Sequence, residues 1–205
     1  LRIGYCQGNF NSDNCAAGGF TLDYGPFGFC EVFDPQYQPW IGGGEHFSFF
    51  NQHVAAEANF YMFWKAIRLL VTDDAVVLEQ LDKVYSGFKE EINTSIQQMW
   101  AEKLGLTNYN DALVQELFPL MVETKVDFTI FFRELCQIPN DLSNLKTSFY
   151  SSISPQLKEQ WQTWIQNWNE LIRSTGDPAE ITEKMKRVNP KYTWREWLIA
   201  PAYQQ

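Results

Sequence analysis

The chain has 205 residues, of which 45% are hydrophobic and 16% aromatic, and its formal net charge at pH 7 is −9. This apolar content allows a sizeable core and argues against wholesale disorder. The net negative charge disfavours nucleic-acid binding and docking on anionic membranes, because both need clustered lysines and arginines. No apolar run approaches the roughly 20 residues of a membrane span. We therefore expect neither a nucleic acid nor a membrane among its partners.

The four cysteines are Cys6, Cys15, Cys30 and Cys136, and there are only two histidines. No two cysteines have C-x-x-C spacing, which disfavours a zinc site. Unpaired, reduced thiols fit an intracellular compartment, and Cys30 is expected to be a buried structural thiol. The sequence begins without a methionine and in what resembles folded material, so we expect a piece of a longer protein.

Glycine dominates the first quarter of the sequence. Residues 1–51 hold nine of the twelve glycines and no lysine, which is typical of loops and small strands. Phe20 and Leu22 alternate with polar neighbours and predict a short strand, ended by the turn-former Gly25-Pro26.

From Gln52 onward the apolar periodicity is helical. The first helix is predicted from Gln52, and the second over 75–104 with a break at Gly87 and Gly105 as its C-cap. Thr124 is predicted to be an N-cap, with Asp127 at the third helical position. The remaining helices are predicted at 108–122, 125–137, 154–174 and 178–187.

Three tryptophans, Trp161, Trp164 and Trp168, are spaced i, i+3, i+7 and therefore share one face of a predicted helix. The spacing favours core packing. An aromatic platform for a sugar or a partner protein is the alternative that the spacing leaves open.

The polar residues that point to chemistry lie in the glycine-rich part. Asp13 and Asp23 are ten residues apart across a glycine-rich reversal, and Asn14 adjoins the first. Carboxylate and amide oxygens so placed can converge on a hard cation such as magnesium. Alternatively, Asp13 and Asn14 cap turns and Asp23 bonds the turn before Gly25. Spacing alone leaves both interpretations open.

The charge balance of this part favours a bound cation. Arg2 is the only Lys or Arg from Leu1 to Trp64, against six acidic residues. Gathering carboxylates without basic partners is costly where they are buried, and a bound metal relieves that cost. Such a segment cannot neutralise a triphosphate, so we expect the cationic side chains to come from sequence upstream of Leu1.

Asn11–Asn14 followed by Asp23–Phe29 resembles the catalytic-loop and metal-loop pair of the selenoprotein O family. The string Asp-Tyr-Gly-Pro-Phe-Gly-Phe is much more specific than a lone kinase Asp-Phe-Gly. The resemblance continues, in the family's order, in Phe47–Gln52, in Lys103–Leu106, in Asp127–Thr129 with Phe132, Arg133 and Leu135 close behind, and in Asn189–Tyr192.

The resemblance implies a kinase-like enzyme that transfers AMP from ATP to hydroxyl side chains of proteins. Asp13 would accept the proton of the attacking hydroxyl. Asn14 and Asp23 would be ligands of magnesium, or of manganese in its place, and Asp23 would also lie near the nucleotide phosphates. Ordinary kinases separate the catalytic Asp and the metal-binding Asn by four residues, whereas Asp13 and Asn14 are adjacent, which disfavours an ordinary protein kinase.

The fold class that follows is mainly α: the C-terminal lobe of a protein-kinase-like fold, with a small β-containing catalytic segment at its N-terminal end. Residues 1–51 would be the catalytic-loop and metal-loop segment, and 52–205 the helical lobe. The family's first lobe and its G-x-G-x-x-G loop are absent from this sequence, so we expect the chain alone to be inactive. Bacterial cytoplasm and mitochondrion both suit the family.

Some positions depart from the family. Gln7-Gly8 stands where many members have His-Gly, and Ser12 replaces a threonine. Members often carry a redox-active Cys or selenocysteine near the C-terminus, but this sequence ends at Gln205 before any such residue, so redox control is not inferred from it. Two rival functions remain: a catalytically silent pseudokinase scaffold, and a protein kinase that transfers the γ-phosphate. Retention of Asp13, Asn14 and Asp23 argues against the scaffold.

Overall fold

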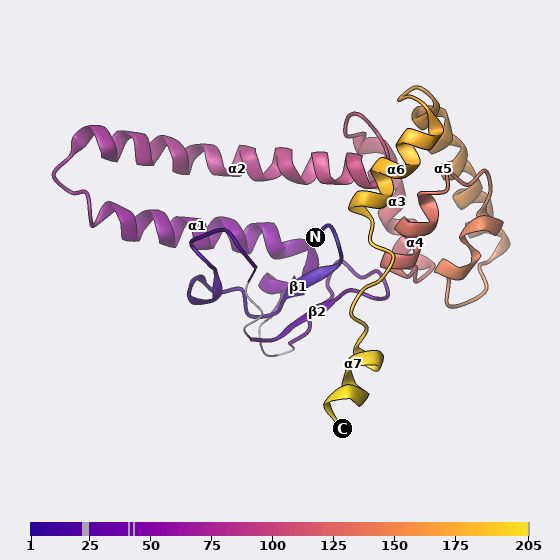
Figure 1. The fold of residues 1–205 in the computed structure, drawn as a ribbon, viewed down its shortest axis with the longest axis horizontal. Coiled ribbons are helices and arrows are strands. Elements are labelled where there is room, and N and C mark those ends of the chain that lie inside the picture. Colours follow the sequence, from indigo (N-terminus) through magenta and orange to yellow (C-terminus); the bar gives the residue numbers. More distant parts are fainter. Residues whose placement is uncertain (22–24, 41, 43, 205) are drawn as a thin grey trace. The chain divides into compact units, whose positions relative to one another are not determined.

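The protein is mostly helical, with a single small sheet in the part that the computed structural model describes, residues 1–21, 25–40, 42 and 44–204 (Figure 1). The chain divides into two compact units. The first comprises Leu1, Cys6–Gly28 and Pro35–Ile96, and the second Arg2–Tyr5, Phe29–Asp34 and Gln97–Gln205. No helix of the described residues is both long and apolar enough to cross a membrane.

The strands are β1 (Tyr5–Gln7) and β2 (Phe27–Phe29), which pair with each other. The short 3-10 helices are η1 (Ser12–Asn14), η3 (Glu45–Phe47), η4 (Phe49–Asn51) and η5 (Leu142–Ser148). The α-helices are α1 (Gln52–Arg68), α2 (Ala75–Lys103), α3 (Asp111–Glu123), α4 (Phe128–Leu135), α5 (Pro155–Arg173), α6 (Pro178–Val188) and α7 (Glu196–Tyr203).

In the first unit, α1 and the first part of α2 run antiparallel. Phe60 stacks on Phe88 with ring centroids 4.2 Å apart, and Trp64 stacks on Tyr85 at 4.7 Å. Further along, Arg68 forms an ion pair with Asp82. Its hydrogen bond is the main reason why the pKa of Asp82 lies below its ordinary value. The pairs are aromatic and polar rather than aliphatic, and they hold the two helices in register.

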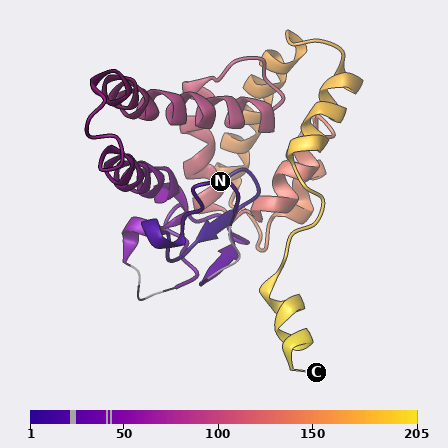
Figure 2. The ribbon, with the colours of Figure 1, turned by 60° about the vertical axis from the view of Figure 1, so that its left-hand side comes forward.

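In the second unit, α3, α4, α5 and α6 lie close together (Figures 1 and 2), and aromatic rings make up much of the buried interior of this unit. Trp161, Trp164 and Trp168 of α5 are almost fully buried, which confirms the prediction of core packing for this stripe. Each indole N–H donates a hydrogen bond, to Thr124 Oγ1, to Leu113 O and to Leu104 O respectively. Burial of these large rings therefore leaves no indole donor unsatisfied.

The predicted helices are confirmed with shifts at their ends, but other details of the prediction are wrong. α2 continues through Gly87 without a break, since one exposed glycine costs a helix only about 1 kcal/mol. The expected strand at Phe20 is absent from Phe20 and Thr21, and Phe20 is 65% exposed; Leu22 lies outside the described residues. The C-terminal helix α7 was not predicted. Gly105 has φ +70°, as expected of a helix C-cap.

The predicted N-cap at Thr124 is also wrong. Thr124 closes α3 instead, with its N–H and Oγ1 both donating to Leu120 O. Lys125 then adopts φ 51°, and Asp127 is the N-cap of α4, accepting from Ile130 N at 2.8 Å. Tertiary pairing explains why α4 begins only at Phe128. Val126 forms a β-bridge with Phe149, and Asp127 forms one with Val32.

Lys103, the last residue of α2, is a buried ionisable residue of the second unit. It is 1% exposed, and its Nζ donates to Arg2 O and to Asn189 Oδ1, both at 2.8 Å. The same nitrogen lies 4.0 Å from the centroid of the Phe132 ring. Burial lowers the pKa of Lys103 from 10.5 to about 7. A neutral amine has two N–H groups, which match the two acceptors.

The pKa of Lys103 is lower in the folded protein than in the unfolded chain, so the unfolded chain binds more protons between about pH 7 and 10.5. The stability contributed by this group is smallest below pH 7 and rises with pH through that window. Between pH 7 and pH 9, we expect the free energy of unfolding of wild type to rise by about 2 kcal/mol more than that of Lys103→Met. Urea denaturation of both proteins at each pH measures the difference. Equal gains in the two proteins would contradict the assignment.

Candidate active site

The polar residues of the predicted catalytic loop lie in a compact turn of the first unit, between β1 and β2. The backbone N–H of Asn14 donates to Asn11 O at 3.0 Å, which closes η1. The side chain of Asn11 donates to Asn9 Oδ1 at 2.6 Å. Asp13 is exposed on this turn, whereas Asn14 is buried. The turn therefore presents a carboxylate to solvent beside a buried amide.

The orientation of the Asn14 amide suits a cation ligand. Its Nδ2 donates to Asn9 O at 3.0 Å, so its Oδ1 is the atom that can accept or ligate. Magnesium takes oxygen ligands and is commonly held by only one or two protein groups, with waters and phosphate oxygens completing its shell. The donor set of this turn fits that ion. Among the described residues no group of three or more His, Cys, Asp and Glu could hold a metal.

The third predicted site residue, Asp23, lies outside the described residues. Asp13 and Asp23 both belong to the single connection between β1 and β2. At the described ends of that connection, Gly8 N donates to Pro26 O at 2.7 Å, just beyond the paired strands.

Two buried side-chain amides of α1 hold the catalytic loop by its backbone. Gln52 Nε2 donates to Gln7 O at 3.1 Å, and Gln52 Oε1 accepts from Gln7 N at 3.0 Å. Asn59 Nδ2 donates to Phe10 O at 2.9 Å. Gln52 thus pairs with Gln7 as a neighbouring strand would, and Asn59 fixes the point where the loop begins to turn.

Sequence reasoning missed both residues. Gln52 and Asn59 are seven apart and share one helix face with Ala55, and all three are buried. Two amides on an otherwise buried face were the available signal, since a buried amide needs hydrogen-bond partners. The sequence could not say which backbone would supply them.

The acidic residues of the first 64 positions are less isolated than the sequence indicated. Glu31 forms an ion pair with Arg195 at 3.0 Å, and Arg195 lies at the other end of the chain. The argument from unpaired carboxylates therefore fails for Glu31, because its basic partner is far away in sequence.

Two cysteines near these loops are structural. Cys30 is fully buried, as predicted, and its Sγ donates to Val32 O at 3.2 Å. Cys6 is also fully buried and donates to Phe47 O at 3.3 Å. Burial raises the pKa of Cys6 to about 12, so this thiol stays protonated at neutral pH.

Comparison with known proteins supplies the family. The profile of the family described as "Protein adenylyltransferase SelO" matches residues 1–205. The chain belongs to the SelO family. Relatives named "Protein nucleotidyltransferase YdiU" include those of Flavobacterium johnsoniae (28% identical, covering 96% of this chain and 40% of the relative) and Tolumonas auensis (31%, 96% and 39%). The relative from Nitrosospira multiformis is 28% identical and covers 100% of this chain and 42% of its own length.

The chain thus spans about two fifths of the length of the SelO-family relatives that it matches. Family membership confirms the resemblance drawn from Asn11–Asn14 and Asp23–Phe29. The assignments of Asp13, Asn14 and Asp23 as site residues stay predictions.

We expect Asn59→Ala, in the full-length protein, to loosen the catalytic loop. The substitution removes the donor to Phe10 O, a loss of about 1 kcal/mol, or roughly fivefold in local opening. Hydrogen exchange of a peptide covering residues 9–14 measures it. Asn93→Ala is the matched control, because Asn93 is exposed on α2 of the same unit. Unchanged exchange in Asn59→Ala would show that Asn59 does not hold the loop.

Proposed function

We propose that this chain carries the proton-acceptor and metal-binding loops of a protein adenylyltransferase, an enzyme that transfers AMP from ATP to Ser, Thr or Tyr hydroxyls of proteins. Membership of the SelO family and its similarity to relatives named as protein nucleotidyltransferases support the reaction class. The proposal includes the C-terminal lobe of a kinase-like fold, with 1–51 as the catalytic segment and 52–205 as the helical lobe.

The observation that carries the proposal is the pair Asp13 and Asn14. One is an exposed carboxylate and the other a buried amide whose nitrogen is already bonded to Asn9 O. Adjacent residues with opposite exposure can serve two purposes: the carboxylate faces an incoming substrate, and the amide oxygen is available to a cation. An asparagine that only caps a turn would not need its side-chain Nδ2 to be bonded to Asn9 O.

The chemistry follows from these atoms. Asp13 accepts the proton of the attacking substrate hydroxyl, while the oxygen of that hydroxyl bonds to the α-phosphorus of ATP. The bond between that phosphorus and the bridging oxygen breaks, and pyrophosphate leaves. Asn14 and Asp23 would hold magnesium, or manganese in its place, which when bound offsets charge on the phosphates. General-base assistance contributes typically 10²–10⁴-fold in rate.

Labelled ATP separates the proposed function from its rivals. With the full-length protein and a protein substrate, label at the α-phosphate should pass to protein and label at the γ-phosphate should not. Transfer of the γ-label would identify a protein kinase instead. Transfer of neither label would favour a silent pseudokinase scaffold.

Substitution of the two carboxylates should give different defects. We expect Asp23→Ala in the full-length protein to abolish transfer, because metal stabilisation of the transition state is worth several kcal/mol. Asp13→Ala should slow the single-turnover rate by roughly 10²–10⁴-fold with little change in nucleotide affinity. Activity of Asp23→Ala within about threefold of wild type would contradict its role, by the same estimate. If Asp13→Ala instead lowers the nucleotide affinity and leaves the single-turnover rate unchanged, Asp13 is a ligand rather than a base.

The isolated chain should bind ATP poorly. Six acidic residues and one arginine lie between Leu1 and Trp64, and Glu31 alone of the six is described above with a basic partner, Arg195. Magnesium offsets only part of the charge of a triphosphate. Kinase-like sites add a lysine and a glycine-rich cover over the phosphates, and electrostatic contacts in an open, wet site are weak. Calorimetric titration of residues 1–205 with magnesium-ATP, after circular dichroism has shown a folded chain, measures this. A low-micromolar dissociation constant would contradict the charge argument.

A further inference from the structure

A cavity of about 540 Å³ lies in the second unit, lined by Arg2, by the end of α2 with the turn that follows it, and by α6. Cavities of this order of size hold small molecules in many proteins. The lining includes three cationic side chains and one carboxylate: Arg2, Lys184, Arg187 and Glu102. We call it the basic cavity. None of the described residues of the candidate active site is among its lining residues.

The charges of the basic cavity do not balance. Arg2 Nη2 forms an ion pair with Glu102 Oε2 at 2.9 Å, so these two charges cancel. Lys184 lies 4.0 Å from Glu180, and with side chains 73% and 71% exposed this pair is weak. The Arg187 side chain forms no ion pair or hydrogen bond with the part of the chain that the structure describes. Three cations and one carboxylate leave the lining with a net charge of +2, in a chain whose formal net charge is −9.

The end of α6 does not itself require the Arg187 guanidinium. Arg187 lies in the last turn of α6, where a cation ordinarily compensates the negative end of the helix dipole. That end already has a guanidinium from another helix, because Arg133 Nη1 donates to Lys186 O at 3.2 Å and to Asn189 O at 3.0 Å. The Arg187 side chain is therefore available to a ligand of the cavity.

A buried hydrogen-bond network holds the walls of the basic cavity together. Lys103 Nζ donates to Arg2 O and to Asn189 Oδ1, both at 2.8 Å. Asn189 directly follows α6, and its Nδ2 donates to Lys103 O at 2.9 Å. The backbone at Arg2, the end of α2 and the end of α6 are thus joined by bonds that lie beneath the surface. The cavity is therefore formed before a ligand arrives.

The basic cavity also has an apolar wall and an available hydroxyl. A Cβ added at Gly105 would lie 2.9 Å from Ile181 Cγ2, so the turn after α2 lies directly against α6. Ile181 and Val188 of α6 contribute apolar surface to the lining. Thr107, also in the lining, forms no hydrogen bond with another described residue. Its hydroxyl can donate to an anion.

We propose that the basic cavity is a binding site for a small organic phosphate. A phosphate monoester carries about −1.5 to −2 charges at pH 7, which matches the net charge of the lining. A guanidinium can bind two phosphate oxygens side by side and an ammonium binds as a point charge, which are the roles of Arg187 and Lys184. Ile181 and Val188 face the organic part of the ligand. A carboxylate has a single charge and would leave one of the two cations uncompensated. The proposal does not rest on the proposed function.

The test is calorimetric titration of the full-length protein, without magnesium, with phenyl phosphate, inorganic phosphate and phenol as probes. We expect phenyl phosphate to bind. Inorganic phosphate should bind more weakly, because it cannot use the apolar wall, and phenol should give no measurable heat. Lys184→Ala and Arg187→Ala should each weaken the binding of phenyl phosphate by roughly five- to tenfold.

Arg173→Ala is the matched control. Arg173 is likewise an exposed arginine in the last turn of a helix, α5, and it does not line the basic cavity. Its removal should leave the affinity for phenyl phosphate unchanged. Melting temperatures of all variants are measured alongside, and because the three side chains are exposed, each variant should stay folded.

The double variant Lys184→Ala, Arg187→Ala assigns the measured heat to this cavity rather than to another phosphate site of the full-length protein. Equal affinity of the double variant and wild type for phenyl phosphate would overturn the proposal, and so would the absence of binding to wild type. Inorganic phosphate that binds as tightly as phenyl phosphate would overturn the assignment to an organic ligand. A phosphoserine peptide is the last probe. If it binds more than about tenfold more tightly than phenyl phosphate, the partner is a phosphoprotein and the small-molecule assignment is wrong.

Discussion

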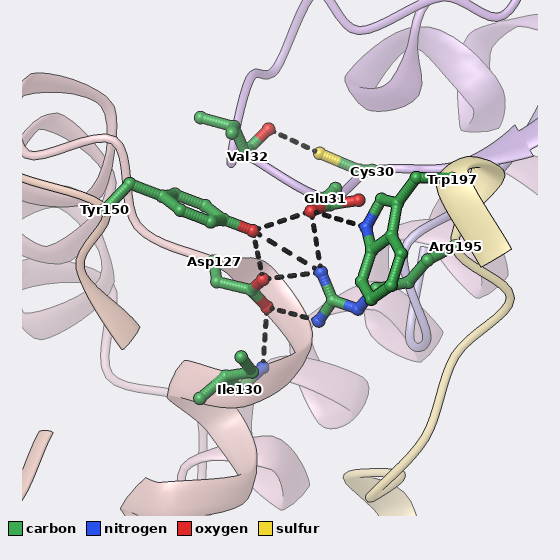
Figure 3. Close-up of polar contacts among 8 residues, drawn as sticks. All are labelled: Cys30, Glu31, Val32, Asp127, Ile130, Tyr150, Arg195 and Trp197. Carbon is green, nitrogen blue, oxygen red and sulfur yellow. Dashed lines mark hydrogen bonds and ion pairs between the residues drawn. The ribbon is translucent and has the colours of Figure 1, made fainter. Parts of the chain in front are cut away.

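A carboxylate with 1% of its surface exposed needs compensation from every side, and Asp127 receives it from three parts of the chain. Ile130 N donates to Oδ1 and so begins α4, while the fork of Arg195 occupies both oxygens. The Tyr150 hydroxyl donates to Oδ2 at 2.6 Å (Figure 3). The start of a helix and the anchoring of the C-terminal segment therefore depend on one buried charge.

Around the catalytic loop, polar groups that need partners are satisfied by side-chain amides and not by an ion pair. Residues 8–14 have little secondary structure of their own, so their backbone groups need partners from elsewhere. Helix α1 supplies them through the buried amides of Gln52 and Asn59. An amide can donate and accept at once, which a hydroxyl or a carboxylate cannot do in the same geometry. A rigid helix can thereby hold an irregular loop without adding a charge next to the predicted metal ligands.

Several stretches that resemble the SelO family prove to be packing contacts rather than chemistry. Lys103 and Asn189, 86 positions apart, bond to each other through Nζ and Oδ1, and Asn189 Nδ2 returns a bond to Lys103 O. The ring of Phe132 covers the amine. Lys103–Leu106, Asn189–Tyr192 and the Asp127 stretch therefore meet in one unit around buried polar groups. Pairs of this kind tolerate little substitution, because a change in one partner leaves the other buried and unsatisfied.

The sequence by itself determined the helical class, the approximate position of every α-helix from Gln52 to Val188, the burial of the tryptophan stripe, and the family through Asn11–Asn14 and Asp23–Phe29. These features are local: periodicity and short motifs depend on neighbours within a few turns. Only the tertiary structure decided that Thr124 ends a helix instead of beginning one, because Val126 and Asp127 pair with segments far away. It alone placed Arg195 on Glu31, and Gln52 and Asn59 on the loop. Each of those contacts joins residues 45 or more positions apart, and a buried polar group reveals in sequence that it needs a partner but not which one.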